Sequence, residues 1–163
     1  MPTEACSGPA LGIENGRIEA AQMSQSSYAE DNPIYGPDRA RLNIPSTPYG
    51  AQLKASDSDG GWFKIDLLNT HVITAFAMQG YGSTGSAARV TSFLISSSND
   101  DAAWLSVAHT HGSPKIFPGN TDNTGILKTT FSPPVIGRYF KITTKTCSVY
   151  CSFRLEIYCC VKI

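Results

Sequence analysis

The sequence of 163 residues has no uninterrupted apolar run as long as the ~18 residues typical of a membrane-spanning helix. Charged residues are scarce, at 16% of the chain against about 25% in a typical soluble domain. The 13 basic and 13 acidic residues balance, and no block of Lys or Arg occurs that would favour a nucleic-acid backbone. We therefore expect neither a transmembrane segment nor a nucleic-acid partner.

Motifs of catalysis are also missing. The chain has no G-x-S-x-G, no P-loop, no H-E-x-x-H and no nucleophile–base pair at a recognisable spacing. Asp100 and Asp101 are adjacent, so on a strand their carboxylates would point apart. These absences predict a protein that is not an enzyme and requires no cofactor.

The start of the chain, Met1 to Cys6, lacks the apolar stretch of a secretory signal. Either such a signal has been removed or the protein is not exported by that route, and the sequence does not decide between them. The cysteines favour export. A bridge from Cys6 to Cys159 or Cys160 would tie the two ends together and imply an oxidising compartment. Closing so long a loop contributes on the order of 5 kcal/mol in the chain-entropy model. Because the chain has five cysteines, one thiol is left over or pairs with another chain.

The apolar pattern has a period of two. Phe63, Ile65 and Leu67 alternate with Lys64 and Asp66, which is typical of a half-buried strand. Further predicted strands are Val72–Met78, Val90–Ser96, Trp104–Ala108, Ile126–Phe131, Tyr139–Thr143 and Phe153–Tyr158. Many short strands at such spacing indicate an all-β sandwich or barrel.

Turn residues separate the predicted strands. Asn69-Thr70 predicts a turn, and Pro133-Pro134 predicts a break before the strand at Tyr139. Three longer stretches rich in Pro, Gly, Ser or Thr are predicted loops: Ala29–Pro37, Ile44–Lys54 and Gly80–Ala88. Loops on a rigid sandwich are where binding residues usually lie, so we expect the ligand site there.

Eight short strings carry a family resemblance. They are Leu11–Ile18, Ala40–Asn43, Trp62–Leu67, Gln79-Gly80, Val90–Phe93, Ser98–Asp100, Phe117–Asp122 and Arg154–Cys160. In this order they resemble LGMESGxI, ARLN, WLQVDL, TQG, VTSYKL, SNDG, FPGNTD and RxELYGC of the discoidin, or coagulation factor 5/8 type C, domain family. The matches keep their order along nearly the whole chain.

The resemblance implies a single all-β domain over residues 1–163 with its core at 6–160. The family fold is an eight-stranded antiparallel jelly-roll-like barrel or sandwich with ligand-binding spike loops at one end. Its members are non-enzymatic modules of secreted or cell-surface proteins, and they bind glycans, anionic phospholipids, collagen or peptide C-termini. Because one fold serves many ligands, the resemblance does not name the ligand.

The cysteines depart from the family pattern. Cys159 stands where the family has Gly before its last Cys. The resemblance therefore implies a Cys6–Cys160 disulfide, with Cys6–Cys159 as the second choice. A second bridge, Cys147–Cys151, fits the loop before the last strand and would leave Cys159 unpaired. A zinc–thiolate cluster is the alternative, but adjacent cysteines chelate one tetrahedral ion awkwardly and the spacing is not C-x2-C.

The leading hypothesis is a recognition and adhesion module that binds a glycan or a cell-surface protein outside the cell. An aromatic face, a carboxylate, hydroxyls and a guanidinium can together hold a sugar or a peptide carboxylate. The residues expected to do so, from their places in the resemblance, are Tyr35, Tyr49, Asp57, Ser83, Thr84 and Arg89. Arg89 also stands where the family has Trp.

The alternative hypothesis is peripheral binding to anionic phospholipid such as phosphatidylserine. In that case large apolar loop residues enter the bilayer above basic ones. The first two loops offer Ile34, Tyr35, Ile44 and Tyr49 for this purpose. Lys54 and Arg89 are the flanking cations. These apolar and basic residues are few for stable anchoring to a membrane.

Two metal sites are considered. Some relatives bind calcium structurally, and Asp31, Asp38 and Glu156 are the corresponding candidates here, although Glu156 could instead pair with a nearby Arg. His109 and His111 would share one face of a strand, but two ligands alone do not form a metal site.

Overall fold

The computed structural model describes residues 9–83 and 85–159. Predictions on Cys6, Thr84 and Cys160 therefore lie outside the described residues. The described part is almost entirely strands and loops, apart from five single 3-10 turns. The strands are β1 (Met23–Gln25), β2 (Ala51–Gln52), β3 (Trp62–Gln79), β4 (Arg89–Ser98), β5 (Leu105–Ser106), β6 (Phe117–Pro118), β7 (Leu127–Ser148) and β8 (Ser152–Cys159). The turns are η1 (Ala20–Gln22), η2 (Ala29–Asp31), η3 (Pro33–Tyr35), η4 (Pro37–Arg39) and η5 (Ala55–Asp57).

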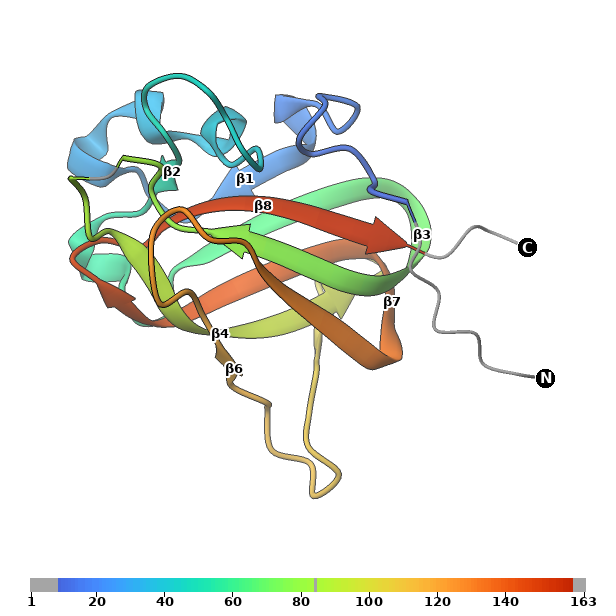
Figure 1. Cartoon of the computed structure of the whole chain (residues 1–163). Helices are drawn as coiled ribbons and strands as arrows, with labels where there is room; N and C mark the ends of the chain where they lie inside the picture. The colour runs from blue at the N-terminus through green and yellow to red at the C-terminus, as the bar shows by residue number, and fades with distance from the viewer. Residues whose placement is uncertain (1–8, 84, 160–163) are drawn as a thin grey trace.

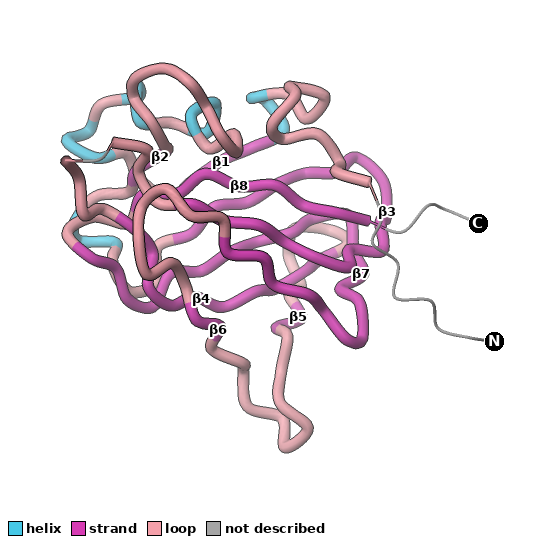
Figure 2. The backbone as a smooth tube through the Cα atoms, viewed as in Figure 1, coloured by secondary structure: helices cyan, strands magenta, loops and turns pink. Residues whose placement is uncertain are grey.

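The eight strands form one antiparallel sheet in the order β2-β8-β3-β7-β4-β5, with β1 added to β3 and β6 added to β4. The sheet does not close into a barrel. Figure 2 shows the 3-10 turns and the loops beside them gathered along one side of the strands, while the connection from β5 to β6 projects elsewhere. The predicted all-β fold with eight antiparallel strands is confirmed. No described helix is long and apolar enough to cross a membrane.

The alternating pattern of β3 produces the predicted two faces. Phe63, Ile65 and Leu67 are buried, whereas Lys64 and Asp66 are only half-buried. Aromatic side chains from neighbouring strands fill the core. The ring of Phe76 packs edge-on against Phe93 at 5.5 Å between centroids. Burying such rings is the main favourable term in the stability of this fold.

The predicted turn at Asn69-Thr70 is wrong, whereas the predicted break at Pro133-Pro134 interrupts the strand pairing without ending β7. Asn69-Thr70 belongs to β3, where Leu68 has a φ of 66° and the pairing register shifts between Asp66 and His71. Pro133-Pro134 belongs to β7, opposite a second register shift between Ile73 and Ala75. A bulge leaves its extra residues unpaired, so turn-forming residues and prolines are tolerated there without ending the strand.

The predicted strand Trp104–Ala108 is mostly irregular. Leu105 and Ser106 pair with β4, Val107 N donates to Ile95 O at 2.9 Å, and Leu105 is 76% exposed. The chain from Leu105 to Phe117, here called the β5–β6 hairpin, then returns to β4. The pairing of β5 with β4 is short because the chain turns away at the Gly, Ser and Pro residues at 112–114.

Strand β8 carries two charged residues into the interior. Arg154 is 5% and Glu156 1% exposed. The carboxylate of Glu156 accepts hydrogen bonds from the backbone N–H groups of Gly12, Ile13 and Glu14 at 3.3, 3.0 and 3.0 Å. Glu156 therefore fastens the segment before β1 to the last strand. It does this through backbone amides and not through a nearby Arg.

The cysteines confirm one predicted bridge. Cys147 and Cys151 form a disulfide that closes the connection between β7 and β8. That bond excludes a zinc–thiolate cluster built on these two residues. The Cys159 thiol is buried and free. Burial raises the pKa of this thiol. The second-choice bridge to Cys159 involves Cys6, which lies outside the described residues. The implied Cys6–Cys160 bond lies outside the described residues.

Candidate ligand site at the loop end

Four half-buried tyrosines from four separate segments lie near one another: Tyr35, Tyr49, Tyr81 and Tyr150. Tyr49 and Tyr81 meet edge to face with their centroids 6.1 Å apart. Burial raises the pKa of Tyr35, and Glu30, Tyr81 and Tyr150 raise it further through their charges. The three predicted loops and the disulfide turn thus converge, and we call this region the loop end. It brings aromatic faces and phenolic hydroxyls together in one region.

Two large apolar side chains are exposed next to this cluster. Ile34 precedes Tyr35 and is 51% exposed, and Val149 precedes Tyr150 and is 69% exposed. The predicted cation Lys54 does not stand free beside them, because it forms an ion pair with Asp31. The loop end therefore has apolar tips, and of the two predicted flanking cations only Arg89 has no acidic partner in the described part of the chain.

Arg89 and Ser83 line a small cleft at the start of β4. The cleft has a volume of about 330 Å³, and its walls are Ser83, Ser86, Arg89, Thr121, Asp122, Asn123 and Thr124. One guanidinium nitrogen of Arg89, Nη1, donates to Ala87 O and to Asn123 Oδ1, both at 3.3 Å. Its Nε is buried with no hydrogen-bond partner among the described residues. Two of the predicted ligand residues, Ser83 and Arg89, thus line one cleft, and the Nε of Arg89 is a hydrogen-bond donor without a partner there. Thr84 lies outside the described residues.

The buried side chain of Arg154 supports this region from behind. Its Nε donates to Gly80 O at 2.8 Å, and its Nη2 donates to Asn123 O at 2.9 Å. At Gly82 a Cβ would come within 3.0 Å of both Arg154 Nη1 and Tyr49 Cβ. A larger residue at Gly82 would therefore press on both Arg154 and Tyr49. One buried guanidinium links the Gly80–Ala88 loop to the loop after Asn120.

Asp57 is occupied by the protein itself. Its Oδ2 accepts hydrogen bonds from Ser26 Oγ at 2.8 Å and Ser27 Oγ at 2.6 Å. Its backbone carbonyl accepts from Gly61 N and Thr144 Oγ1. The structure therefore gives Asp57 the contacts of a loop-fixing residue, because its carboxylate and its carbonyl are both engaged by the protein.

The predicted calcium ligands have separate partners. Asp31 pairs with Lys54, Asp38 pairs with Arg41 at 2.8 Å, and Glu156 binds backbone amides. Across residues 9–83 and 85–159, no three His, Cys, Asp or Glu side chains group in a way that could hold a metal ion. The rings of His109 and His111 stack at 5.0 Å on the exposed β5–β6 hairpin.

Sequence reasoning missed Tyr81, Tyr150 and Asn123. Tyr81 directly follows Gln79-Gly80, and Tyr150 lies between the two bonded cysteines. Both positions were readable as parts of loops already under consideration. Asn123 had no such signal, because its role depends on a loop that reaches Arg89 from 34 positions away.

Comparison with known proteins agrees with this architecture. The family model described as F5/8 type C domain matches residues 22–157. The chain belongs to this family. Domains of the family are non-enzymatic binding modules.

Relatives of this F5/8 type C domain include human coagulation factor V, with 37% identity over 158 residues. Mouse coagulation factor VIII is 31% identical over 157 residues. The alignments cover 95% and 96% of this chain. They cover only 7% of each relative, so the chain corresponds to a small part of those proteins.

Solved structures share the fold at low identity. Wild-type discoidin II from Dictyostelium discoideum superimposes with a TM-score of 0.79 at 20% identity, covering 96% of this chain and 60% of that one. The family 32 carbohydrate-binding module of C. perfringens NanJ, solved in complex with galactose, has a TM-score of 0.61 at 19% identity. It covers 86% of this chain and 96% of its own.

Proposed function

We propose that this F5/8 type C domain is an extracellular recognition module that binds a glycan, free or carried on a cell-surface protein, through the loop end. The observation that carries the proposal is the gathering of Tyr35, Tyr49, Tyr81 and Tyr150 from four segments. Aromatic faces bind the apolar faces of sugars, and the hydroxyls and guanidinium nearby supply hydrogen bonds. Ser83 and Arg89 are the polar partners in this proposal.

Two further observations support the proposal. The carbohydrate-binding module that shares the fold was solved with galactose bound, which shows that this architecture accommodates a sugar. The Cys147–Cys151 disulfide is expected of a protein that matures in an oxidising compartment. The same disulfide is consistent with an extracellular location.

A glycan array probed with the purified domain, with calcium and again with EDTA, tests the proposal. Selective hits are expected, and they should weaken at least about tenfold in Tyr49→Ala and Tyr150→Ala, because buried aromatic anchors dominate such interfaces. Tyr139→Ala is the matched control. Tyr139 also meets an aromatic ring edge to face, Trp104 at 6.4 Å, but it lies on the paired stretch of β7.

A blank array in both conditions would overturn the glycan proposal. The exposed tips Ile34 and Val149 then favour the second candidate, an anionic lipid surface. Vesicles containing phosphatidylserine would bind the wild-type domain, and binding would be lost in Ile34→Ser with Val149→Ser. If Tyr49→Ala and Tyr139→Ala weaken glycan binding equally, the sugar binds elsewhere on the domain.

A further inference from the structure

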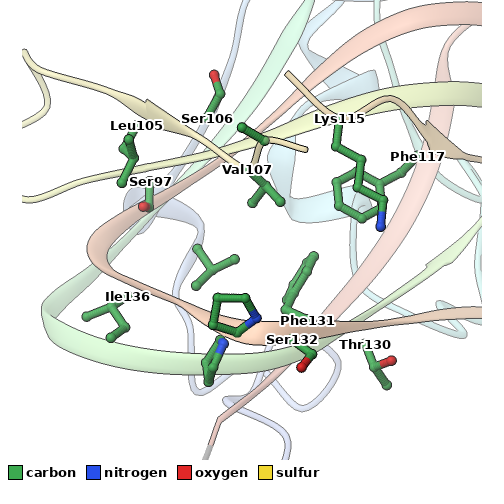
Figure 3. A pocket seen from close by; sticks show the side chains of 14 residues that line it. Ser97, Leu105, Ser106, Val107, Lys115, Phe117, Thr130, Phe131, Ser132 and Ile136 are labelled. Atoms are coloured by element: carbon green, nitrogen blue, oxygen red, sulfur yellow. The ribbon is translucent and has the colours of Figure 1, made fainter. Parts of the chain in front are cut away.

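A second cavity, here called the hairpin pocket, lies between the β5–β6 hairpin and the proline-containing bend of β7 (Figure 3). Its volume is about 370 Å³, within the range of small-molecule sites. None of its lining residues belongs to the loop end. Its lining residues are Ser97, Leu105, Ser106, Val107, Ala108, Lys115, Phe117, Thr130, Phe131, Ser132, Pro133, Pro134, Val135 and Ile136.

The walls of the hairpin pocket are mainly apolar. Figure 3 shows Val107 and Phe131 projecting toward the same space from opposite walls, with Phe117 at one end. The rings of Phe117 and Phe131 meet edge to face at 5.8 Å. At the mouth, Leu105 is 76% and Ile136 58% exposed. The apolar surface therefore continues out of the pocket, as an extended apolar ligand would require.

One cation stands at the pocket. Lys115 Nζ lies 4.9 Å from the centroid of the Phe117 ring. Three other lysines, Lys54, Lys64 and Lys145, each pair with an Asp, whereas Lys115 pairs with no acid in the described part of the chain. The ammonium group is thus free to meet an anion at the edge of an apolar cavity.

We propose that the hairpin pocket binds a linear-chain monocarboxylate, with its chain against Val107 and Phe131 and its carboxylate at Lys115. The one cation among the lining residues selects one anionic group, and the apolar walls select a hydrocarbon body. If each non-hydrogen atom takes roughly the 30 Å³ of a water in the liquid, the pocket holds about twelve. Decanoate is a probe of that size, and a longer chain would extend over Leu105 and Ile136.

Titration of the labelled domain with decanoate, below the concentration at which it forms micelles, tests the proposal by amide chemical shifts. Shifts are expected for residues 105–117 and 130–136, and not for Tyr35 or Tyr150. Lys115→Gln should weaken the binding about three- to fivefold, the effect of losing one solvent-exposed ion pair. Decanol should bind the wild-type domain more weakly than decanoate, and Lys115→Gln should remove that difference.

Lys128→Gln is the matched control, because Lys128 Nζ also lies over an aromatic ring, that of Tyr158 at 4.4 Å. Val107→Phe fills the cavity from its wall and should abolish the shifts while a thermal unfolding curve reports that the domain still folds. The proposal is overturned if decanoate perturbs only the loop end, or if Lys115→Gln and Lys128→Gln bind it equally. These outcomes are independent of the glycan experiment, because the two sites share no residue.

Discussion

The loop end and the hairpin pocket present their side chains by different means. At the loop end, segments with little regular structure are held by a few buried polar contacts, chiefly those of Arg154 with Gly80 and Asn123. In the hairpin pocket, Phe117 and Phe131 stand on strands that pack directly into the apolar core. A ligand site on loops therefore depends on individual hydrogen bonds, whereas a site on strands depends on the packing of the whole sheet.

The largest expected effect comes from Arg154→Met. This substitution removes the hydrogen bonds that Arg154 donates at the loop end and leaves the hairpin pocket untouched. Two buried carbonyl groups lose a charged donor, so we expect the free energy of unfolding to fall by about 3 kcal/mol. Urea unfolding measures this loss. Amide shifts should change across residues 80–89 and 120–125 and stay unchanged at 130–136. Glycan binding should fall together with the loop-end shifts.

Arg138→Met is the control for this comparison. Arg138 also donates two hydrogen bonds, to the carboxylate of Asp66, but both partners are accessible to solvent. Exposed ion pairs contribute little, so this variant should unfold close to the wild type. Equal destabilisation by Arg154→Met and Arg138→Met would contradict the dependence of the loop end on buried contacts.

An intermediate effect is expected when the disulfide is removed by Cys147→Ala with Cys151→Ala. The bonded residues are separated by 4 positions, and for so short a loop the chain-entropy model gives about 2 kcal/mol. Thermal unfolding measures the loss, and a reducing agent should destabilise the wild type by more than the variant, the difference being the contribution of the Cys147–Cys151 bond. Within the loop end the variant should loosen Tyr150 and spare the Tyr49–Tyr81 contact. A general loss of loop-end order would show that the segments are not held independently.

The same contrast explains what the sequence could predict. Alternation in Phe63 to Leu67 predicted a strand correctly, because burial on one face follows directly from a period of two. The Cys147–Cys151 bond was predicted because the two residues are close along the chain. Asn69-Thr70 was wrongly predicted as a turn, since a local signal does not distinguish a turn from a bulge in a long strand. The break predicted at Pro133-Pro134 is a register shift within β7 and not the end of a strand.

The candidate site was less predictable than the fold. Tyr35, Tyr49 and Arg89 were selected from single loops, and they do lie at the loop end. Asp57 was selected in the same way, but contacts with Ser26 and Ser27 engage its carboxylate. Such contacts join residues about 30 positions apart, and no local pattern encodes them. The hairpin pocket had no sequence signal, because its walls meet only after β5, β6 and β7 are assembled.

The smallest expected effect is a pH dependence of the free energy of unfolding that comes from Asp66. This residue pairs with Arg138 of β7, the strand that also lines the hairpin pocket. The hydrogen bond from Arg138 lowers the pKa of Asp66 below its ordinary value of 3.8, although partial burial opposes the shift. A carboxyl group with a depressed folded-state pKa stabilises the fold above its unfolded-state pKa. That stability is lost as the pH falls through the folded-state pKa. Asp66→Asn should therefore be slightly less stable than the wild type at pH 7, and the difference should vanish in the acid range.

Urea unfolding of both proteins at pH 7 and in steps below pH 3.8, down to the lowest pH at which the domain folds, each at low and high salt, checks this prediction. Salt should reduce the difference at pH 7, because the pair is accessible to solvent and is screened. A difference that persists at acid pH would mean that Asp66 acts by another contact, its hydrogen bond from Leu68 N at 2.8 Å, which fixes the bulge in β3. Asparagine retains an acceptor oxygen for that bond, so the charge alone should account for what is lost. A polar contact on the sheet surface would then matter far less than the buried contacts of Arg154, because the strands beneath it are held by their own core.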